Sequence, residues 1–234
     1  MKRFYSNNIQ SNFIYLNDDE AQHLTKVLRG RIGDKVEVLN GNGFLYEGKI
    51  ANLQKHEVQI EITQVLKEQE ENLNKLSIAI CPTKNPSRLE WFLEKATEIG
   101  IVNIFPIISE RTEKATLKHE RLQQIIISAA KQSGQLFFPT LHQIQSLKEF
   151  QQSPNLLFDS FFIAHCEDEK QHLKNLYKKD KTALLLIGPE GDFSSKEIEL
   201  SINKNYIPVS LGNSILRVET AGVVACSIIQ MMND

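Results

Sequence analysis

Two short segments in the last quarter of the chain hold the residues best placed to do chemistry. The first, residues 188–193 (GPEGDF), follows the apolar run 184–187 and precedes a helical pattern. Glycines at a strand-to-helix turn let the backbone approach a ligand closely, and ligands of open α/β sheets bind at the carboxyl ends of strands. The glycines fit an ordinary turn equally well. Neither GxGxxG nor GxxxxGK[ST] occurs, which argues against a Rossmann dinucleotide site and a P-loop NTPase.

The second segment, residues 211–221 (LGNSILRVETA), links a short predicted strand to a helix that starts near Glu219. Together with Glu190 it would place two acids and an arginine, Arg217, at neighbouring strand ends. Such a set suits a cationic ligand and an RNA phosphate. The alternatives are structural, because Glu219 would also complement the dipole of its helix and Arg217 would also be a solvated surface residue.

The elements that must position these residues belong to two regions of the sequence with different hydrophobic patterns. From residue 76 onward, short apolar runs alternate with helical patterns, which predicts an α/β domain with parallel strands and helices on both faces. The expected strands are 76–80, 102–108, 156–164, 182–187 and 208–211, and the expected helices are 88–99, 122–133, 195–202 and 219–232.

The first third is predicted to be β-rich. Alternating patterns at 35–39, 44–53 and 57–65, with the hairpin signal NGNG at 40–43 and one short helix before Gly30, suggest a small barrel. The polar stretch 67–75 has no periodic apolar positions and is the best linker candidate. The sequence therefore divides into domains 1–68 and 73–234.

Composition narrows the class of protein. Hydrophobic residues make up 41% and charged residues 24%, as in ordinary soluble proteins, and no apolar run reaches the length of a membrane span. Three scattered cysteines without a CxxC pair, and histidines without ligand spacing, predict no metal site. The N-terminus resembles no signal peptide, so we expect a cytoplasmic protein. A net charge of −2 argues mildly against RNA, so RNA binding would need a focused basic patch.

GPEGDF followed about twenty residues later by LGNSILRVETA resembles the signature of the RsmE family, the 16S ribosomal RNA uracil-N3 methyltransferases of the SPOUT superfamily. The resemblance covers the whole chain. Residues 23–43 look like the family's PUA-like β-barrel, residues 94–112 like the first helix and strand of its catalytic domain, and residues 129–141 like the following helix and turn.

The resemblance implies a trefoil-knotted, parallel-sheet SPOUT domain behind a PUA-like barrel, working as a homodimer. It implies that S-adenosylmethionine binds between two loops, and that the strand end near residues 164–166 also contributes to its site. The loop residues expected to contact this cofactor are Gly188, Pro189, Glu190, Gly191, Leu211, Gly212, Ile215 and Leu216. The implied reaction is methylation of uracil N3 at one site in 16S ribosomal RNA, within the assembled small subunit.

In that reaction the uracil N3 must lose its proton and leave its base pair before it can be methylated. Arg217 is the first choice for holding the base or its phosphate and favouring the developing anion, and Glu219 or Glu190 could accept the proton. Helix capping at Glu219 and loop stabilisation at Glu190 remain open as alternatives. For RNA docking we expect a set of basic residues: Lys2, Arg3, Arg29 and Arg31 in the first domain, and Lys84, Arg88 and Arg111 in the second.

The chain departs from the family pattern at two places. Many members have GPEGG where this chain has Asp192, so that side chain must either contact the cofactor or project away from it. Many also carry an arginine soon after an AxxQS segment, where this chain has residues 134–136 (GQL), so an RNA contact there is lost or moved to Lys131. Two alternatives stay open: a superfamily methyltransferase acting on another RNA or base atom, and an RNA-binding scaffold that has lost activity.

Overall fold

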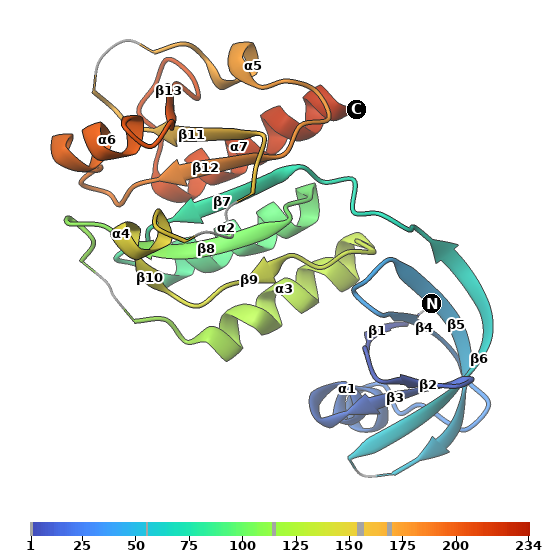
Figure 1. Ribbon diagram of the computed structural model, residues 1–234. Coiled ribbons are helices and arrows are strands. Elements are labelled where there is room, and N and C mark those ends of the chain that lie inside the picture. The colour runs from blue at the N-terminus through green and yellow to red at the C-terminus, as the bar shows by residue number, and fades with distance from the viewer. Residues whose placement is uncertain (1, 55, 114–115, 154–156, 168–169) are drawn as a thin grey trace. The chain divides into compact units, whose positions relative to one another are not determined.

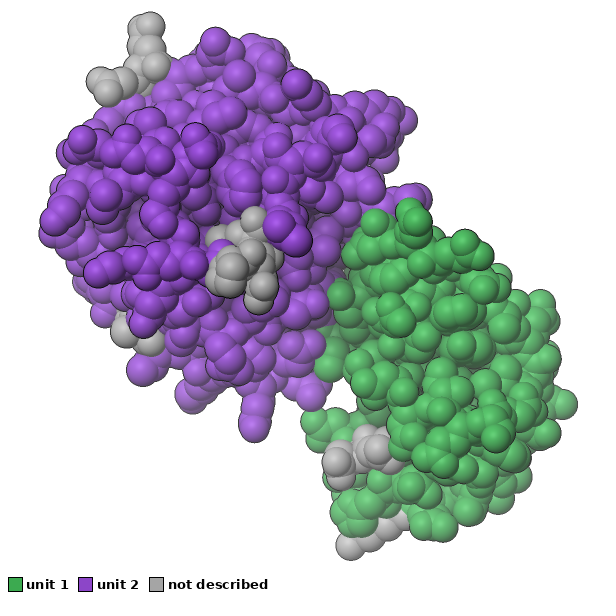
Figure 2. Space-filling view, in the orientation of Figure 1, with its two compact units in different colours: residues 1–72, 127–138 green, residues 73–126, 139–234 purple. Residues whose placement is uncertain are grey.

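The computed structural model describes residues 2–54, 56–113, 116–153, 157–167 and 170–234 and consists of two compact units (Figures 1 and 2). Unit 1 comprises residues 1–72 and 127–138, and unit 2 comprises residues 73–126 and 139–234. The sequence placed 127–138 in the second domain. Local contacts explain the difference, since the amide of Gly43 donates to the carbonyl of Leu136 and the ring of Tyr5 packs on that of Phe138.

Unit 1 is built on a mixed six-stranded sheet in the order β1-β4-β5-β6-β3-β2. Its strands are β1 Arg3–Tyr5, β2 Ile9–Gln10, β3 Phe13–Asn17, β4 Lys35–Leu39, β5 Phe44–Leu53 and β6 Glu57–Glu68. Among the described strand pairs of this sheet, only β1–β4 is parallel, and the others are antiparallel. The core is formed by inward-facing side chains of these strands and of the helix, including Phe4, Ile14, Leu16, Leu24, Val38 and Ile60.

The short helix predicted before Gly30 is present, but it changes type along its length. An α-helical part, α1 Asp18–Gln22, continues as a π-helical part, η1 His23–Val27, in which the amide of Leu28 bonds to the carbonyl of His23. The predicted hairpin turn is confirmed between β4 and β5. The Asn40 side chain accepts hydrogen bonds from the amides of Asn42 and Phe44 there.

Unit 2 contains seven strands that pair only in parallel, in the order β10-β8-β7-β12-β11-β13, with β9 beside β8. They are β7 Leu76–Ile80, β8 Asn103–Ile108, β9 Thr140–Leu141, β10 Gln145–Ser146, β11 Ser160–Ala164, β12 Ala183–Ile187 and β13 Ile207–Val209. The strand predicted at 156–164 is shorter in the structure, where it begins at Ser160. Residue 156 lies outside the described residues.

Helices cover both faces of this sheet, as the alternation of patterns predicts. They are α2 Pro86–Ile99, α3 His119–Ser133, α4 Leu147–Phe150, α5 Leu173–Leu176, α6 Ser195–Ile202 and α7 Val218–Asn233 (Figure 1). One core layer joins the sheet to α2, α3, α5 and α7, and a second joins it to α4 and α6. Every residue of β7 and β12 is buried, as in strands covered on both faces.

The helices α2 and α7 pack closely at one point, where Gly222 of α7 lies against the fully buried ring of Phe92. Both helices begin at the carboxyl edge of the sheet. Asn85 caps α2 through the amide of Ser87, with Pro86 in its first turn. This packing brings the first turns of α2 and α7, and hence Arg88 and Glu219, together.

Candidate active site

The candidate site lies at the carboxyl edge of the unit 2 sheet. Because all strands are parallel, the segments that follow β7, β8, β11, β12 and β13 emerge at the same edge. They bring together residues 81–85, 109–113, 188–194 and 210–217, although these segments lie far apart in the sequence.

The loop after β12 is held in place by Asp192, the residue that departs from the family pattern. Its amide closes a turn on the carbonyl of Pro189 at 3.0 Å, and its backbone is left-handed with φ of 60°. One carboxylate oxygen accepts from the amide of Cys166 at 2.7 Å, and the other from that of Phe193 at 2.8 Å. Asp192 thus ties the end of β11 to the loop after β12. Burial, and then this carboxylate, raise the pKa of the Cys166 thiol.

The same loop is held from the other side by the segment after β8. Arg111 donates through Nη1 to the carbonyl of Gly191 at 2.9 Å and to that of Phe193 at 3.4 Å. Next to it, the amide of Glu110 donates to Glu197, at the start of α6, at 2.8 Å. Arg111, whose contact with RNA stays a prediction, is thus a donor to the candidate cofactor loop.

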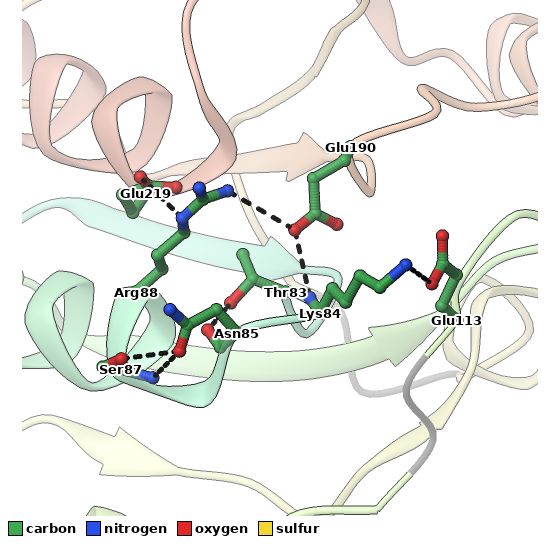
Figure 3. Close-up of polar contacts among 8 residues, drawn as sticks. All are labelled: Thr83, Lys84, Asn85, Ser87, Arg88, Glu113, Glu190 and Glu219. Carbon is green, nitrogen blue, oxygen red and sulfur yellow. Dashed lines mark hydrogen bonds and ion pairs between the residues drawn. The ribbon is translucent and has the colours of Figure 1, made fainter.

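Figure 3 shows the Arg88 side chain between two carboxylates. Its Nη1 lies 3.9 Å from Oε1 of Glu190, and its Nε lies 3.8 Å from Oε1 of Glu219. The amide of Lys84 donates to the same Glu190 oxygen at 3.0 Å, while the Lys84 ammonium pairs with Glu113 at 2.8 Å. The predicted proton acceptors are therefore neighbours, and Arg88, predicted to dock RNA, joins them.

Glu219 is the most unusual group of the site. The residue is only 8% exposed, and its Oε2 is buried without a hydrogen-bond partner in the described part of the chain. Most buried polar atoms are bonded, because an unsatisfied one costs about 1–3 kcal/mol and a charged one costs more. Capping of the helix does not account for this oxygen. A ligand that donates a hydrogen bond would satisfy it.

The loop after β13 is open. The Ser210 hydroxyl bonds to the carbonyl of Gly212 at 2.8 Å, and the Gly212 backbone has φ of 153° with no described atom within 4 Å of where a Cβ would lie. Ile215 is 85% exposed and Leu216 is half-buried. Arg217, at the N-cap of α7, is exposed and makes no ion pair or side-chain hydrogen bond with the described residues.

The remaining predicted RNA contacts lie in unit 1 and differ in their partners. Arg29, with φ of 50°, and Arg31 are exposed. Lys2 donates to the carbonyl of Leu28 at 2.9 Å and lines a shallow pocket of about 300 Å³ together with Leu24, Gly30, Asp34, Lys35, Val36 and Ile50. Arg3 has the clearest structural role, since it pairs with Glu37 at 3.1 Å.

The second departure from the family pattern, at residues 134–136, lies in unit 1. A Cβ on Gly134 would lie 3.1 Å from Nη1 of Arg3. The Arg3 guanidinium therefore lies beside the start of the segment in which the family pattern has an arginine and this chain has none. Arg3 donates to the carbonyl of Lys131 at 2.8 Å, and the Lys131 ammonium is paired with Glu20. Lys131 is therefore engaged within unit 1 rather than free to replace the missing contact.

Among the described residues, no group of three or more His, Cys, Asp or Glu side chains is placed to hold a metal ion. No helix in the described ranges is both long and apolar enough to cross a membrane.

Comparison with known proteins connects this geometry to a chemistry. A family model described as an RNA methyltransferase domain matches residues 69–230, and one described as an RNA methyltransferase PUA domain matches residues 16–63. The chain is 30% identical to the ribosomal RNA small subunit methyltransferase E of Aquifex aeolicus, over 98% of this chain and 99% of that protein.

Two solved structures are similar over nearly their whole length. A probable rRNA methyltransferase from Porphyromonas gingivalis shares 35% identity with a TM-score of 0.87, over 100% of this chain and 98% of that one. The ribosomal RNA small subunit methyltransferase E of Neisseria gonorrhoeae, solved with S-adenosylmethionine bound, shares 27% identity with a TM-score of 0.86, over the same fractions of the two chains.

Proposed function

Because this chain belongs to the ribosomal RNA small subunit methyltransferase E family of RNA methyltransferases, we propose that it methylates N3 of a uridine in 16S ribosomal RNA with S-adenosylmethionine. The observation that carries the choice of atom is the buried, unpartnered Oε2 of Glu219. The base of a uridine carries one N–H, at N3, and this group can donate a hydrogen bond to such an oxygen. The proposal includes a cytoplasmic homodimer that acts on the assembled small subunit.

The residues at the carboxyl edge fit the cofactor. Gly212 leaves open space beside its backbone, and the exposed side chain of Ile215 offers an apolar surface for an adenine ring. On the other side, Gly188 and Pro189 form the buried base of the loop that Asp192 and Arg111 hold. When bound, S-adenosylmethionine supplies an electrophilic methyl group on a sulfonium centre. The proposal includes the trefoil knot that the family resemblance implies for this domain.

Two side chains at the start of α7 have different roles toward the base. Arg217, exposed and unpaired in the described part of the chain, holds the flipped base or its phosphate and stabilises the developing anion. Glu219 accepts the N3 proton through Oε2. Glu190 is the weaker candidate, because the Lys84 amide already occupies its Oε1. Since the nucleophile and the methyl group must align, positioning contributes most of the rate.

The experiment is methylation of purified small subunits that lack the modification, followed by nucleoside mass spectrometry. We expect N3-methyluridine at one site. Arg217→Ala should reduce turnover by about 10²-fold or more with little change in cofactor affinity, as expected for a lost stabiliser of developing charge. Glu219→Gln should lose most rate at low pH, because raising the pH ionises N3 without help.

Other results would point elsewhere. Cofactor binding without methyl transfer to these subunits would favour an inactive RNA-binding scaffold. Methylation of another base atom or another RNA would retain the enzyme class and reject the proposed substrate.

A further inference from the structure

We infer that Arg88 is a positioning residue of the active site, which holds and orients the buried carboxylate of Glu219 through Oε1, leaves its Oε2 for the substrate, and ties Glu190 to the same cation. This inference deepens the proposed function and rests on it. The sequence assigned Arg88 to RNA docking, and nothing in the family comparison gives it this role.

The geometry favours a bridge rather than a single ion pair. The guanidinium presents Nε to Glu219 at 3.8 Å and Nη1 to Glu190 at 3.9 Å (Figure 3). Arginine suits such a place because its donors form a rigid fork that two acceptors can share, which a lysine ammonium cannot reproduce. Each partner is fixed from elsewhere, Glu190 by the Lys84 amide and Glu219 by the first turn of α7.

The electrostatics give the bridge a function. Burial favours the protonated form of a carboxyl group, and a cation within about 4–6 Å favours the ionised form. Arg88 is the cation nearest to the buried Glu219, and Glu190 across it is a second negative charge. Lys84 is paired with Glu113, and Arg217 precedes Glu219 on the exposed side. Without Arg88, the buried Glu219 would lose its nearest compensating cation and, with it, the contact that orients its carboxylate for the N3 proton.

The bridge also explains why Glu219 keeps an oxygen free. Both contacts of Arg88 go to Oε1 atoms, so Oε2 of Glu219 is left for a donor that arrives with the RNA. A carboxylate held by one oxygen and unpartnered at the other is oriented before the base enters. Arg88 therefore acts through Glu219, without touching the base.

The test compares Arg88→Gln, Arg88→Lys and the control Arg121→Gln in the full-length protein. Arg121 pairs with Glu90, two residues along α2 from Arg88, and is exposed, so the control removes the same charge outside the site. Single-turnover methyl transfer to small subunits is measured from pH 6 to 9 at saturating S-adenosylmethionine, with cofactor affinity from calorimetry.

Arg88→Gln should lower the rate at pH 6 by about tenfold or more, which is part of the roughly 10²–10⁴-fold that a positioned general base contributes, and by less at pH 9, where N3 ionises without help. Cofactor affinity should change by less than about threefold, because the ion pairs of the Arg88 guanidinium in the described part of the chain are with the two carboxylates. Arg88→Lys should recover part of the rate, and Arg121→Gln should match the wild type. A loss that is equal at all pH values, or that follows cofactor affinity, would overturn the inference.

A second measurement does not depend on methyl transfer. Denaturation midpoints are compared for Arg88→Gln, Glu219→Gln and the double variant. Arg88→Gln removes the cation that pairs with a buried acid, so it should lower the denaturation midpoint. Adding Glu219→Gln removes that acid too and should restore part of the lost stability. Strictly additive shifts would mean that the two side chains are not coupled. Coupling without any methyl transfer by the wild type would instead reject the proposed function and leave the pairing intact.

Discussion

Replacing Gly222 with alanine should destabilise unit 2 and impair the site, because this glycine sets the distance between α2 and α7. The added Cβ would lie 2.3 Å from Cε2 and 2.5 Å from Cδ2 of Phe92, a ring with no exposed surface. Ordinary carbon contacts are about 3.5–4.0 Å, so the helices or the ring must give way by about 1 Å.

The magnitude follows from two opposing effects. Overfilling a packed core costs about 1–3 kcal/mol, and a fully buried ring in direct collision belongs at the upper end. Alanine gains about 1 kcal/mol over glycine in a helix interior. The net loss is therefore about 2 kcal/mol, which lowers the melting temperature of a domain of this size by about 4–8 °C.

Trp91, beside Phe92 and the single tryptophan of the chain, allows the unfolding of this region to be followed by fluorescence. The clash should disappear when Phe92 is also shortened to leucine. Methyl transfer should fall in Gly222→Ala, because moving α7 separates Arg88 from Glu219. A variant as stable as the wild type, or more stable through helix propensity alone, would refute this account of the packing.

Three further predictions concern the loops and unit 1. Asp192→Asn keeps the left-handed turn but removes a charge that raises the pKa of the Cys166 thiol, so iodoacetamide should label this exposed cysteine faster at neutral pH; an unchanged rate would contradict the coupling. Gly212→Val should weaken cofactor binding in calorimetry, because a β-branched residue is strained at φ of 153°. Arg29→Gln with Arg31→Gln should reduce the salt dependence of RNA binding by a log–log slope of about 0.7–0.9 per lost phosphate contact.

The sequence predicts the fold well wherever the signals are local. The strand Leu76–Ile80 is confirmed at its exact bounds, because a short apolar run between polar segments is typical of a strand buried on both faces. The helix predicted at 195–202 is confirmed as Ser195–Ile202, and the Ser194 and Glu197 side chains form the reciprocal bonds of a capping box at its start. Such features depend on residues within a few positions of one another.

Long-range contacts were not predictable in the same way. Arg88 is one basic residue among 27 in the sequence, and its place between two carboxylates depends on the order of β7 and β12 and on the packing of Gly222. A signal existed, because Arg88 lies in the first turn of a helix that follows a parallel strand and so faces the same edge as Glu190. The role of Asp192 depends likewise on Cys166, at the end of another strand.

The partners of the predicted RNA contacts show which of them are available for RNA in a chain with a net charge of −2. Arg3 and Lys84 are neutralised by Glu37 and Glu113, and Arg88 lies between two acids. The exposed guanidinium groups of Arg29, Arg31 and Arg217 form no ion pair within the described residues. Because three of the seven predicted RNA contacts are engaged with acids, fewer of them are left to bind phosphates of RNA of arbitrary sequence, and phosphate contacts supply most of that affinity. On the proposed function, selectivity then has to come from the shape of an assembled RNA surface, which agrees with the small subunit, rather than free RNA, as the substrate.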